Sequence, residues 1–174
     1  MTIPIVIYGS PVLRKKSFDI DKPDDIDSLA ENMIQTLKKA AGIGLAGPQV
    51  GVLKNIFVID TSIYKNEGTE KVEKVYINPE ILNNSDNKTY YNEGCLSIPG
   101  IFEDVNRPEK VEVRYRDLTF DWHQETLDGI VARIFQHECD HLQGILFVDR
   151  LNALRRKLIR NKLNQIAKKK YVII

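Results

Sequence analysis

Residues 134–141 read Ile134-Phe135-Gln136-His137-Glu138-Cys139-Asp140-His141, and this segment carries the main structural and chemical signal of the chain. On a helix, residues four apart share one face, so His137 and His141 can direct their imidazole nitrogens at a single metal ion. Glu138 then lies beside the metal rather than on it, which is where a general base acting on metal-bound water is expected. The pattern His-Glu-x-x-His therefore predicts a catalytic metal site. The alternative is a helix with two solvated histidines and an incidental glutamate.

The residues around the motif predict a buried helix from about Thr126 to Leu142. Such a helix is apolar on more than one face, because two stripes run side by side along it. The first stripe contains Ile130, Ile134, His137 and His141, and the second contains Val131, Phe135, Glu138 and Leu142. Gly144 fits a C-terminal stop. Since buried histidines need polar partners, a metal that satisfies both is favoured over solvated side chains.

Length and composition indicate one soluble globular domain spanning residues 1–174. The chain has 174 residues, of which 43% are hydrophobic and 28% charged, values that are ordinary for such a domain. No stretch approaches the roughly 20 apolar residues of a membrane span, and the N-terminal residues read as a strand rather than a signal peptide. Two cysteines are too few for a disulfide scaffold. We expect a cytoplasmic monomer that binds neither membrane nor DNA.

The basic residues are concentrated at the C-terminus. Residues 150–174 hold nine Lys and Arg and no acid, although the net charge of the whole chain is only +1. One interpretation is a solvated terminal helix that packs leucines on the core, namely Leu151, Leu154, Leu158 and Leu163. The other is a contact with a polyanion, for which ribosomal RNA is the candidate. Few aromatic residues interrupt the basic ones, so recognition by base stacking is not indicated.

The remaining pattern predicts the α+β class. Asp24, Asp25 and Asp27 can cap a helix over residues 26–41. Short β-like runs follow at 55–60, 72–78, 90–93 and 110–116, and 120–125 returns as a hairpin partner after a turn at 117–119. Residues 64–73 read as a polar loop. We expect short antiparallel sheets packed around a buried central helix, with an N-terminal helix and a basic C-terminal helix.

A catalytic metal usually takes three protein ligands, and the third is expected upstream of the helix. Asp149 reads as a surface acid, and Cys139 should project away from the metal and serve packing. Cys95, which follows Gly94, offers a thiolate beside a residue that permits close backbone approach. Its alternative role is that of a small buried apolar residue.

Three segments together resemble peptide deformylase. They are Gly42-Ile43-Gly44-Leu45-Ala46-Gly47-Pro48-Gln49, Glu93-Gly94-Cys95-Leu96-Ser97 and Gln136-His137-Glu138-Cys139-Asp140-His141-Leu142. Their order and spacing agree with that family, and the similarity extends to about Asp149. Gly47 stands where the family commonly has a second alanine, a change that should loosen the loop slightly. The glycines at 42, 44 and 47 also fit a dinucleotide fingerprint, but that motif needs a strand before it and a helix after it, the reverse of the order expected here.

The resemblance implies a reaction and its residues. Cys95, His137 and His141 would bind one divalent metal, with Fe²⁺ expected in the cell and Zn²⁺, Ni²⁺ or Co²⁺ also suited to this donor set. The substrate would be a nascent polypeptide beginning with N-formylmethionine. Glu138 would act as the general base, and the oxyanion would be held by the Gln49 side-chain amide and the Leu96 backbone N–H. Formate and a free amino terminus would be the products.

The first two motifs also suit a peptide groove, in which small residues let an extended peptide pair like an added strand. The candidate substrate-binding residues on the two motifs and the helix are Ile43, Gly44, Leu45, Gly94, Ile130, Arg133 (through its stem) and Ile134, with Leu96 also a candidate for the methionine pocket. Glu93 and Arg107 would orient a ligand or the loop, unless they form an ordinary surface ion pair. Trp122 and His123 are expected to be structural.

Two other functions fit parts of this pattern. One is a metallopeptidase that cuts internal peptide bonds, which an upstream cysteine ligand argues against. The other is a non-catalytic peptide-binding relative, which the intact set of ligands, base and Gln49 argues against.

Overall fold

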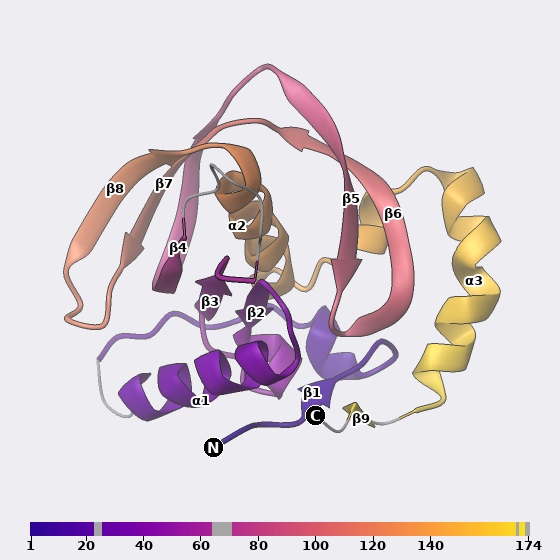
Figure 1. Cartoon of the computed structure of the whole chain (residues 1–174), viewed down its shortest axis with the longest axis horizontal. Coiled ribbons are helices and arrows are strands. Elements are labelled where there is room, and N and C mark those ends of the chain that lie inside the picture. Colours follow the sequence, from indigo (N-terminus) through magenta and orange to yellow (C-terminus); the bar gives the residue numbers. More distant parts are fainter. Residues whose placement is uncertain (23–25, 64–70, 170, 173–174) are drawn as a thin grey trace.

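A computed structural model describes residues 1–22, 26–63, 71–169 and 171–172. Figure 1 shows a central helix, α2, between a larger sheet and a long curved hairpin, with α1 below them and α3 along the outer side of β6. The helices are α1 (Ile26–Lys39), α2 (Gly129–Leu142) and α3 (Ala153–Ala167), with short 3-10 turns η1 (Pro11–Arg14), η2 (Gly47–Val50) and η3 (Phe147–Arg150). The strands are β1 (Ile5–Val6), β2 (Gly44–Ala46), β3 (Ile56–Asp60), β4 (Glu73–Asn84), β5 (Lys88–Cys95), β6 (Ile98–Pro108), β7 (Val111–Arg116), β8 (Trp122–Leu127) and β9 (Tyr171–Val172).

The larger sheet has the strand order β2-β3-β4-β7-β8, and all of its pairings are antiparallel. Strand β2 lies at one edge, where its partner is β3. The hairpin β5–β6 forms a second sheet, and β1 pairs with β9 to join the two ends of the described chain. The α+β architecture expected from the sequence is confirmed.

Helix α2 is buried because both of its apolar stripes are covered. The Phe135 ring packs edge-on against Phe57 and Tyr76 of the larger sheet, with ring centroids 5.1 Å apart in each pair. On its other side, Arg133 and His137 bond to Glu93 of β5. The central helix thus joins the two sheets, and the metal motif lies where they meet. The helix begins at Gly129 rather than Thr126, since Thr126 and Leu127 continue β8.

Two strands differ from the sequence-based expectation. Strand β4 was expected to end at Asn78, before Pro79, but it continues to Asn84 through a β-bulge between Ile77 and Glu80. Asn78 adopts a positive φ of 48°, and its side chain bonds to both backbone polar groups of Ile20, so the bulge is held from outside the sheet. Strand β6 was not predicted, because its inward positions alternate apolar residues with Glu103 and Arg107.

The C-terminal helix packs through a different set of residues from the one expected. Leu151 and Leu163 are buried together with Ile159, but Leu154 and Leu158 are 66% and 63% exposed. The two exposed leucines lie on the solvent face with the basic residues, so the prediction that they pack on the core was wrong. Asp24 and Asp25 and most of the expected loop at 64–73 lie outside the described residues.

None of the described helices is both long enough and apolar enough to cross a membrane.

Candidate metal centre and peptide cavity

Three potential metal ligands meet where β5 passes α2. The β5–β6 register shifts directly after Gly94, so that Cys95 faces Ile98 and not the next residue in step. The bulge turns the Cys95 thiol toward the helix. One ligand atom from each of Cys95, His137 and His141 lies within 4.8 Å of the others. The structure therefore brings together the three residues proposed from the sequence as ligands.

The donor set fits a divalent transition metal. The Cys95 Sγ lies 3.2 Å from His141 Nε2, and both imidazoles are buried. Among the described residues, His141 Nδ1 has no hydrogen-bond partner. Burial lowers the pKa of His141 well below its usual value, which keeps the ring neutral, as ligation requires. A thiolate with two neutral imidazoles is a set that zinc, iron, nickel and cobalt all accept.

Glu93 holds His137 in one tautomer. Its Oε2 lies 2.9 Å from His137 Nδ1, so this nitrogen donates and Nε2 is left to face Cys95. Burial alone would raise the pKa of Glu93, but the hydrogen bonds from His137 and Arg107 outweigh it and lower the pKa to about 2. Glu93 and Arg107 are nearly fully buried, so their contact is not an ordinary surface ion pair.

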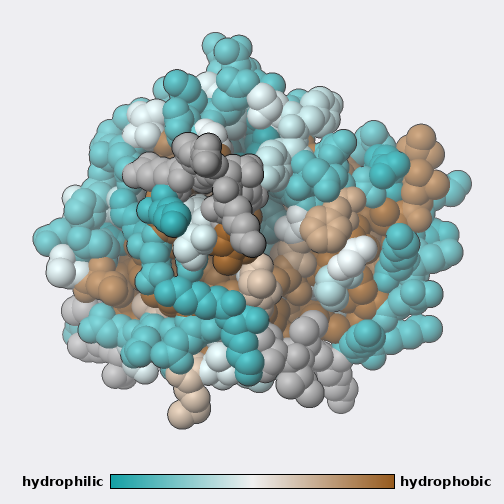
Figure 2. Space-filling view, in the orientation of Figure 1, coloured by the Kyte–Doolittle hydropathy of each residue, from teal (hydrophilic) through white to brown (hydrophobic). Residues whose placement is uncertain are grey.

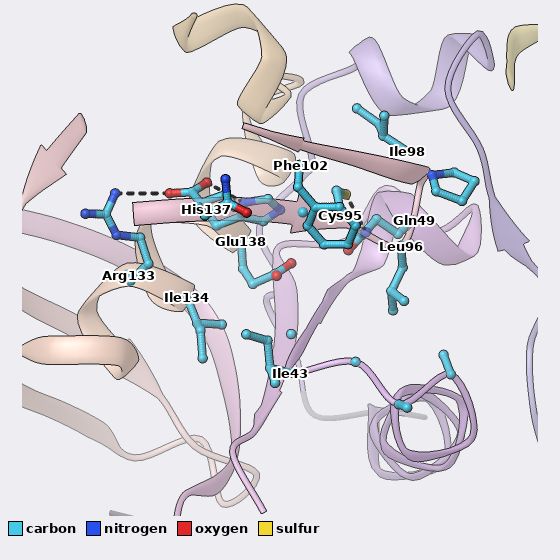
Figure 3. A pocket seen from close by; sticks show the side chains of 18 of the residues that line it. Ile43, Gln49, Cys95, Leu96, Ile98, Phe102, Arg133, Ile134, His137 and Glu138 are labelled. Carbon is cyan, nitrogen blue, oxygen red and sulfur yellow. Dashed lines mark hydrogen bonds and ion pairs between the residues drawn. The ribbon is translucent and has the colours of Figure 1, made fainter. Parts of the chain in front are cut away.

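Glu138 points its carboxylate into the cavity between His137 and Ile43 (Figure 3). Its Oε2 is buried without a hydrogen-bond partner among the described residues. Burial raises the pKa of Glu138 to about 7. Gly44 leaves room for this carboxylate, since a Cβ there would lie 2.3 Å from Glu138 Oε1. A carboxylate with this environment is suited to accept and return a proton near neutral pH.

Gln49 is held with its amide nitrogen toward the same point. Its Oε1 accepts a hydrogen bond from the Ala46 backbone N–H at 2.8 Å, which fixes the orientation of the amide. Its Nε2 then donates toward Ser97 Oγ at 3.2 Å and Cys95 Sγ at 3.4 Å. The Gln49 side chain thus connects the first motif, residues 42–49, with the second, residues 93–97. Gly47, next to it, packs against backbone, since a Cβ would lie 2.7 Å from the Val52 carbonyl oxygen. The expectation that this glycine loosens the loop is at odds with such close packing.

A cavity of about 800 Å³ opens above these residues. Figure 2 shows apolar residues gathered in the hollow between the α1 side of the molecule and the β5–β6 hairpin. Of the residues predicted to bind substrate, those that line the cavity are Ile43, Gly44, Gly94, Ile130, Arg133 and Ile134, and Leu96 lines it as well. Leu45 does not: it is fully buried in the core beside α1. Leu45 lies between Gly44 and Ala46 on a strand, so it faces the opposite side of the sheet from the cavity.

Some of the cavity wall was missed from the sequence. Phe102 and Tyr91 line the cavity, and Phe102 lies directly opposite Gly94 across the hairpin. Phe102 is 64% exposed although it is a large aromatic residue. The available signal was a pair of aromatic residues flanking the second motif, which is weak without knowledge of the strand register. Arg133 also lines the cavity. Its guanidinium is tied to Glu93, Val105 O and Thr89 O, an arrangement compatible with the prediction that only its stem faces the substrate.

The comparisons with known proteins agree with this geometry. The polypeptide deformylase family model matches residues 2–157. The chain is 44% identical to a peptide deformylase of Cytophaga hutchinsonii, over 97% of this chain and 92% of that protein. It is 43% identical to one of Agrobacterium fabrum, over 98% and 99% respectively. Among solved structures, a Plasmodium falciparum peptide deformylase superposes with a TM-score of 0.86 at 39% identity, covering 94% of this chain and 95% of that one.

The chain therefore belongs to the polypeptide deformylase family. Members of this class are metal-dependent hydrolases. The activity is removal of the N-formyl group from the N-terminal formylmethionine of newly synthesised polypeptides, which releases formate.

Proposed function

We propose that Cys95, His137 and His141 hold the single divalent metal of this deformylase, and that Glu138 moves the proton. The observation that carries this proposal is the convergence of the three ligand atoms within 4.8 Å at the base of a cavity into which Glu138 also points. His141 Nδ1 and Glu138 Oε2, which are buried and have no hydrogen-bond partner among the described residues, add support, because both are costly without a cation or substrate beside them.

When bound, the metal supplies a Lewis acid that acidifies water and polarises the formyl carbonyl. Glu138 accepts a proton from the attacking water as the new C–O bond forms at the formyl carbon. Its carboxylic acid then returns that proton to the departing nitrogen as the C–N bond breaks. The carbon product is released as formic acid, which passes its remaining proton to the free amine at neutral pH. The products are therefore formate and a protonated amino terminus, and atoms and charge balance without a further reactant.

Gln49 and Leu96 stabilise the charge that develops on the formyl oxygen. The Gln49 amide is oriented in advance by its bond to Ala46, so it needs no rearrangement during reaction. Leu96 follows Cys95 at the bulge, and its backbone N–H is proposed as the second donor. Together they supply the hydrogen bonds that the tetrahedral oxyanion needs beyond the metal.

The substrate peptide enters the groove between β2 and β5. Strand β2 is an edge strand of its sheet, so its backbone can pair with an extended peptide. Such pairing uses hydrogen bonds to the peptide backbone, so peptides of many different sequences can be processed. The methionine side chain fits the apolar part of the cavity, whose wall includes Ile43, Ile130 and Ile134.

The metal in the cell is proposed to be Fe²⁺, with Zn²⁺, Ni²⁺ and Co²⁺ also accepted by these ligands. A thiolate ligand makes oxidative loss of activity reasonable. Metal analysis of protein purified without oxygen tests this choice: the proposal requires iron at about one atom per chain, together with loss of activity in air. Zinc alone in fully active protein would overturn it.

The general-base role is tested with Glu138→Ala. We expect the variant to keep its metal and lose nearly all formate release from a formyl-Met peptide, in protein purified without oxygen. Glu80→Ala is the matched control, since Glu80 is a half-exposed glutamate paired with Arg114 away from the cavity. Near-normal turnover by Glu138→Ala would show that the base is another group.

The basic C-terminal segment is proposed to contact the ribosome. All of its described basic residues from Arg155 to Lys169 are exposed, whereas Ile159 and Leu163 are buried, so charge reversal is a better test than truncation. Arg156→Glu with Lys157→Glu and Arg160→Glu should abolish co-sedimentation with ribosomes. Reversal of Lys15, Lys16 and Lys22 is the matched control. Equal co-sedimentation of the two triple variants would overturn the proposal.

We further propose that residues 1–174 form a single domain that works as a monomer in the cytoplasm. One continuous set of packed elements supports this organisation, with β1 paired to β9 across the termini. A single cooperative unfolding transition and a monomeric mass in light scattering are the expected results.

A further inference from the structure

A chain of paired side chains, buried except for its last member Arg150, runs from His137 to the C-terminal segment. Glu93 accepts from His137 on one oxygen and from Arg107 on both, through Arg107 Nε at 2.7 Å and Nη2 at 2.9 Å. The remaining Arg107 nitrogen, Nη1, donates to Asp140 Oδ2 at 2.7 Å. Asp140 in turn accepts two hydrogen bonds from Arg150, one on each carboxylate oxygen. The contacts are continuous, and each is charged.

We propose that Asp140 and Arg150 are positioning residues that fix the orientation of the metal ligand His137 through Arg107 and Glu93. The inference rests on the proposed role of His137 as a ligand. It extends that role to two residues that belong neither to the cavity lining nor to the group of three candidate ligands.

The geometry supports this because the Arg107 guanidinium is planar and bound along two edges. The two parallel bonds to Glu93 fix the plane, and the bond to Asp140 holds the opposite end. With Asp140 in place, Glu93 cannot rotate without breaking three charged contacts. The His137 ring is thereby held with Nδ1 toward Glu93 and Nε2 toward Cys95.

The charge balance points the same way. The network contains three guanidiniums, from Arg107, Arg133 and Arg150, and two carboxylates, from Glu93 and Asp140. Arg107 is only 2% exposed, so its charge depends on these two acids. Removal of the Asp140 charge would leave Glu93 as the one carboxylate of the network facing three guanidiniums. Because its negative charge would then be offset more strongly, Glu93 would polarise His137 less. A less basic imidazole is a weaker ligand.

Arg150 gives the network an accessible end. Its side chain is 41% exposed, whereas Asp140 is 9% exposed. Arg150 is the last residue of η3, and α3 begins three residues later. It can therefore be changed without opening the core, which makes it the safer of the two positions for a test.

The experiment measures Co²⁺ binding to metal-free protein by competition with a chelator, and records the thiolate-to-cobalt and ligand-field absorption bands. Asp140→Asn should weaken Co²⁺ binding by roughly tenfold or more and shift these bands, as expected for loss of a group that supports a ligand. Arg150→Gln should weaken binding by a smaller factor, and Arg150→Lys should recover part of that loss. Formate release should fall in the same order.

Arg155→Gln is the matched control. Arg155 lies in the same basic segment and also pairs with a buried carboxylate, that of Glu103. Glu103 lies opposite Glu93 across the β5–β6 hairpin, but among the described residues no hydrogen bond joins the two side chains. The control variant should bind Co²⁺ as the wild type does. If Asp140→Asn does not fold, the Co²⁺ affinity and spectrum of Arg150→Gln alone test the positioning role.

The outcomes separate this inference from the proposed metal site. If the wild type itself fails to bind one Co²⁺ per chain with a thiolate band, the proposed ligand set is wrong. If the wild type binds and both variants match it in affinity and spectrum, the positioning role is overturned. A loss of stability without a change in Co²⁺ affinity would mean that the network serves folding alone, and this also overturns the proposal.

Discussion

Two histidine–carboxylate pairs in this molecule look alike in contact but differ in surroundings. His137 Nδ1 lies 2.9 Å from Glu93 beneath the cavity, and His123 Nε2 lies 2.5 Å from Asp117 at the β7–β8 turn. The His137 and Glu93 side chains are 10% and 4% exposed, whereas those of His123 and Asp117 are 45% and 33% exposed. The pKa of each carboxyl is lowered to about 2.

The causes of the two equal pKa values differ. For Glu93, burial opposes ionisation, and the bonds from His137 and Arg107 overcome it. For Asp117, the Thr119 hydroxyl contributes most, with smaller help from His123 and from backbone N–H groups of the turn. A similar distance and pKa therefore do not imply a similar contribution to stability, because solvent screens the exposed pair and not the buried one. Whether such a pair can position a ligand therefore depends on its burial and on the further partners of its carboxylate.

The largest expected effect comes from the buried pair. Glu93→Gln leaves Arg107 and Arg133 without their shared carboxylate, and removal of one partner from a buried ion pair costs about 3–5 kcal/mol. We expect urea denaturation of the metal-free protein to show a loss of this size, and metal affinity to fall roughly 10–100-fold. A loss below about 1 kcal/mol, the range of exposed pairs, would remove the distinction between the two pairs.

The packing around the buried site gives a second, more local effect. Gly44→Ala places a Cβ 2.3 Å from Glu138 Oε1 and 2.8 Å from Ile134 Cγ2. Glu138 must then move by about an ångström, which can cost on the order of a hundredfold in kcat. Metal content should be unchanged, because the ligands are not displaced.

Gly129→Ala is the control for this substitution. A Cβ at Gly129 meets no atom within 4 Å, but the residue has a positive φ of 54°. The change should therefore cost roughly 1–2 kcal/mol of stability and leave kcat intact. If Gly44→Ala kept normal turnover, the close fit around Glu138 would not matter for catalysis.

The convergence of Cys95, His137 and His141 was predictable from the sequence because each of these residues lies in a short local motif. The i, i+4 spacing predicted that His137 and His141 share one face, and the thiol of Cys95 beside Gly94 suggested the third ligand. The role of Gln49 came only from the resemblance to peptide deformylase. The helix itself was predictable from its two apolar stripes, and its start was wrong by three residues because Thr126 and Leu127 suit a strand equally well.

The parts that were missed depend on contacts between distant segments. The sequence around Asp140 does not distinguish it from other polar helix residues. Its role becomes visible only from its partners Arg107 and Arg150, which lie 33 and 10 residues away in the chain. Strand β6 turns charged residues inward, which defeats a pattern based on alternating hydrophobicity. The side chain of Leu45 points into the core because of strand alternation, although its backbone lies on the edge strand β2, where peptide pairing was predicted. These three features depend on strand register and on pairing between distant segments, which cannot be deduced from the local spacing of residues.

The smallest effect is expected at the exposed pair, and it has a distinct pH dependence. Asp117→Asn should lower the free energy of unfolding by about 0.2–1 kcal/mol near pH 6. The folded-state pKa of about 2 lies below the ordinary value of 3.8, so the carboxylate stabilises the fold above about pH 4, and this contribution is lost as the pH falls toward 2. The difference between the wild type and the variant should accordingly shrink between pH 6 and pH 3 in urea denaturation. Formate release at pH 7 should be unaffected, since the turn lies outside the cavity lining. A difference that stayed constant or grew on acidification would mean that Asp117 acts through its neutral hydrogen bonds, and that its charge does not stabilise the turn.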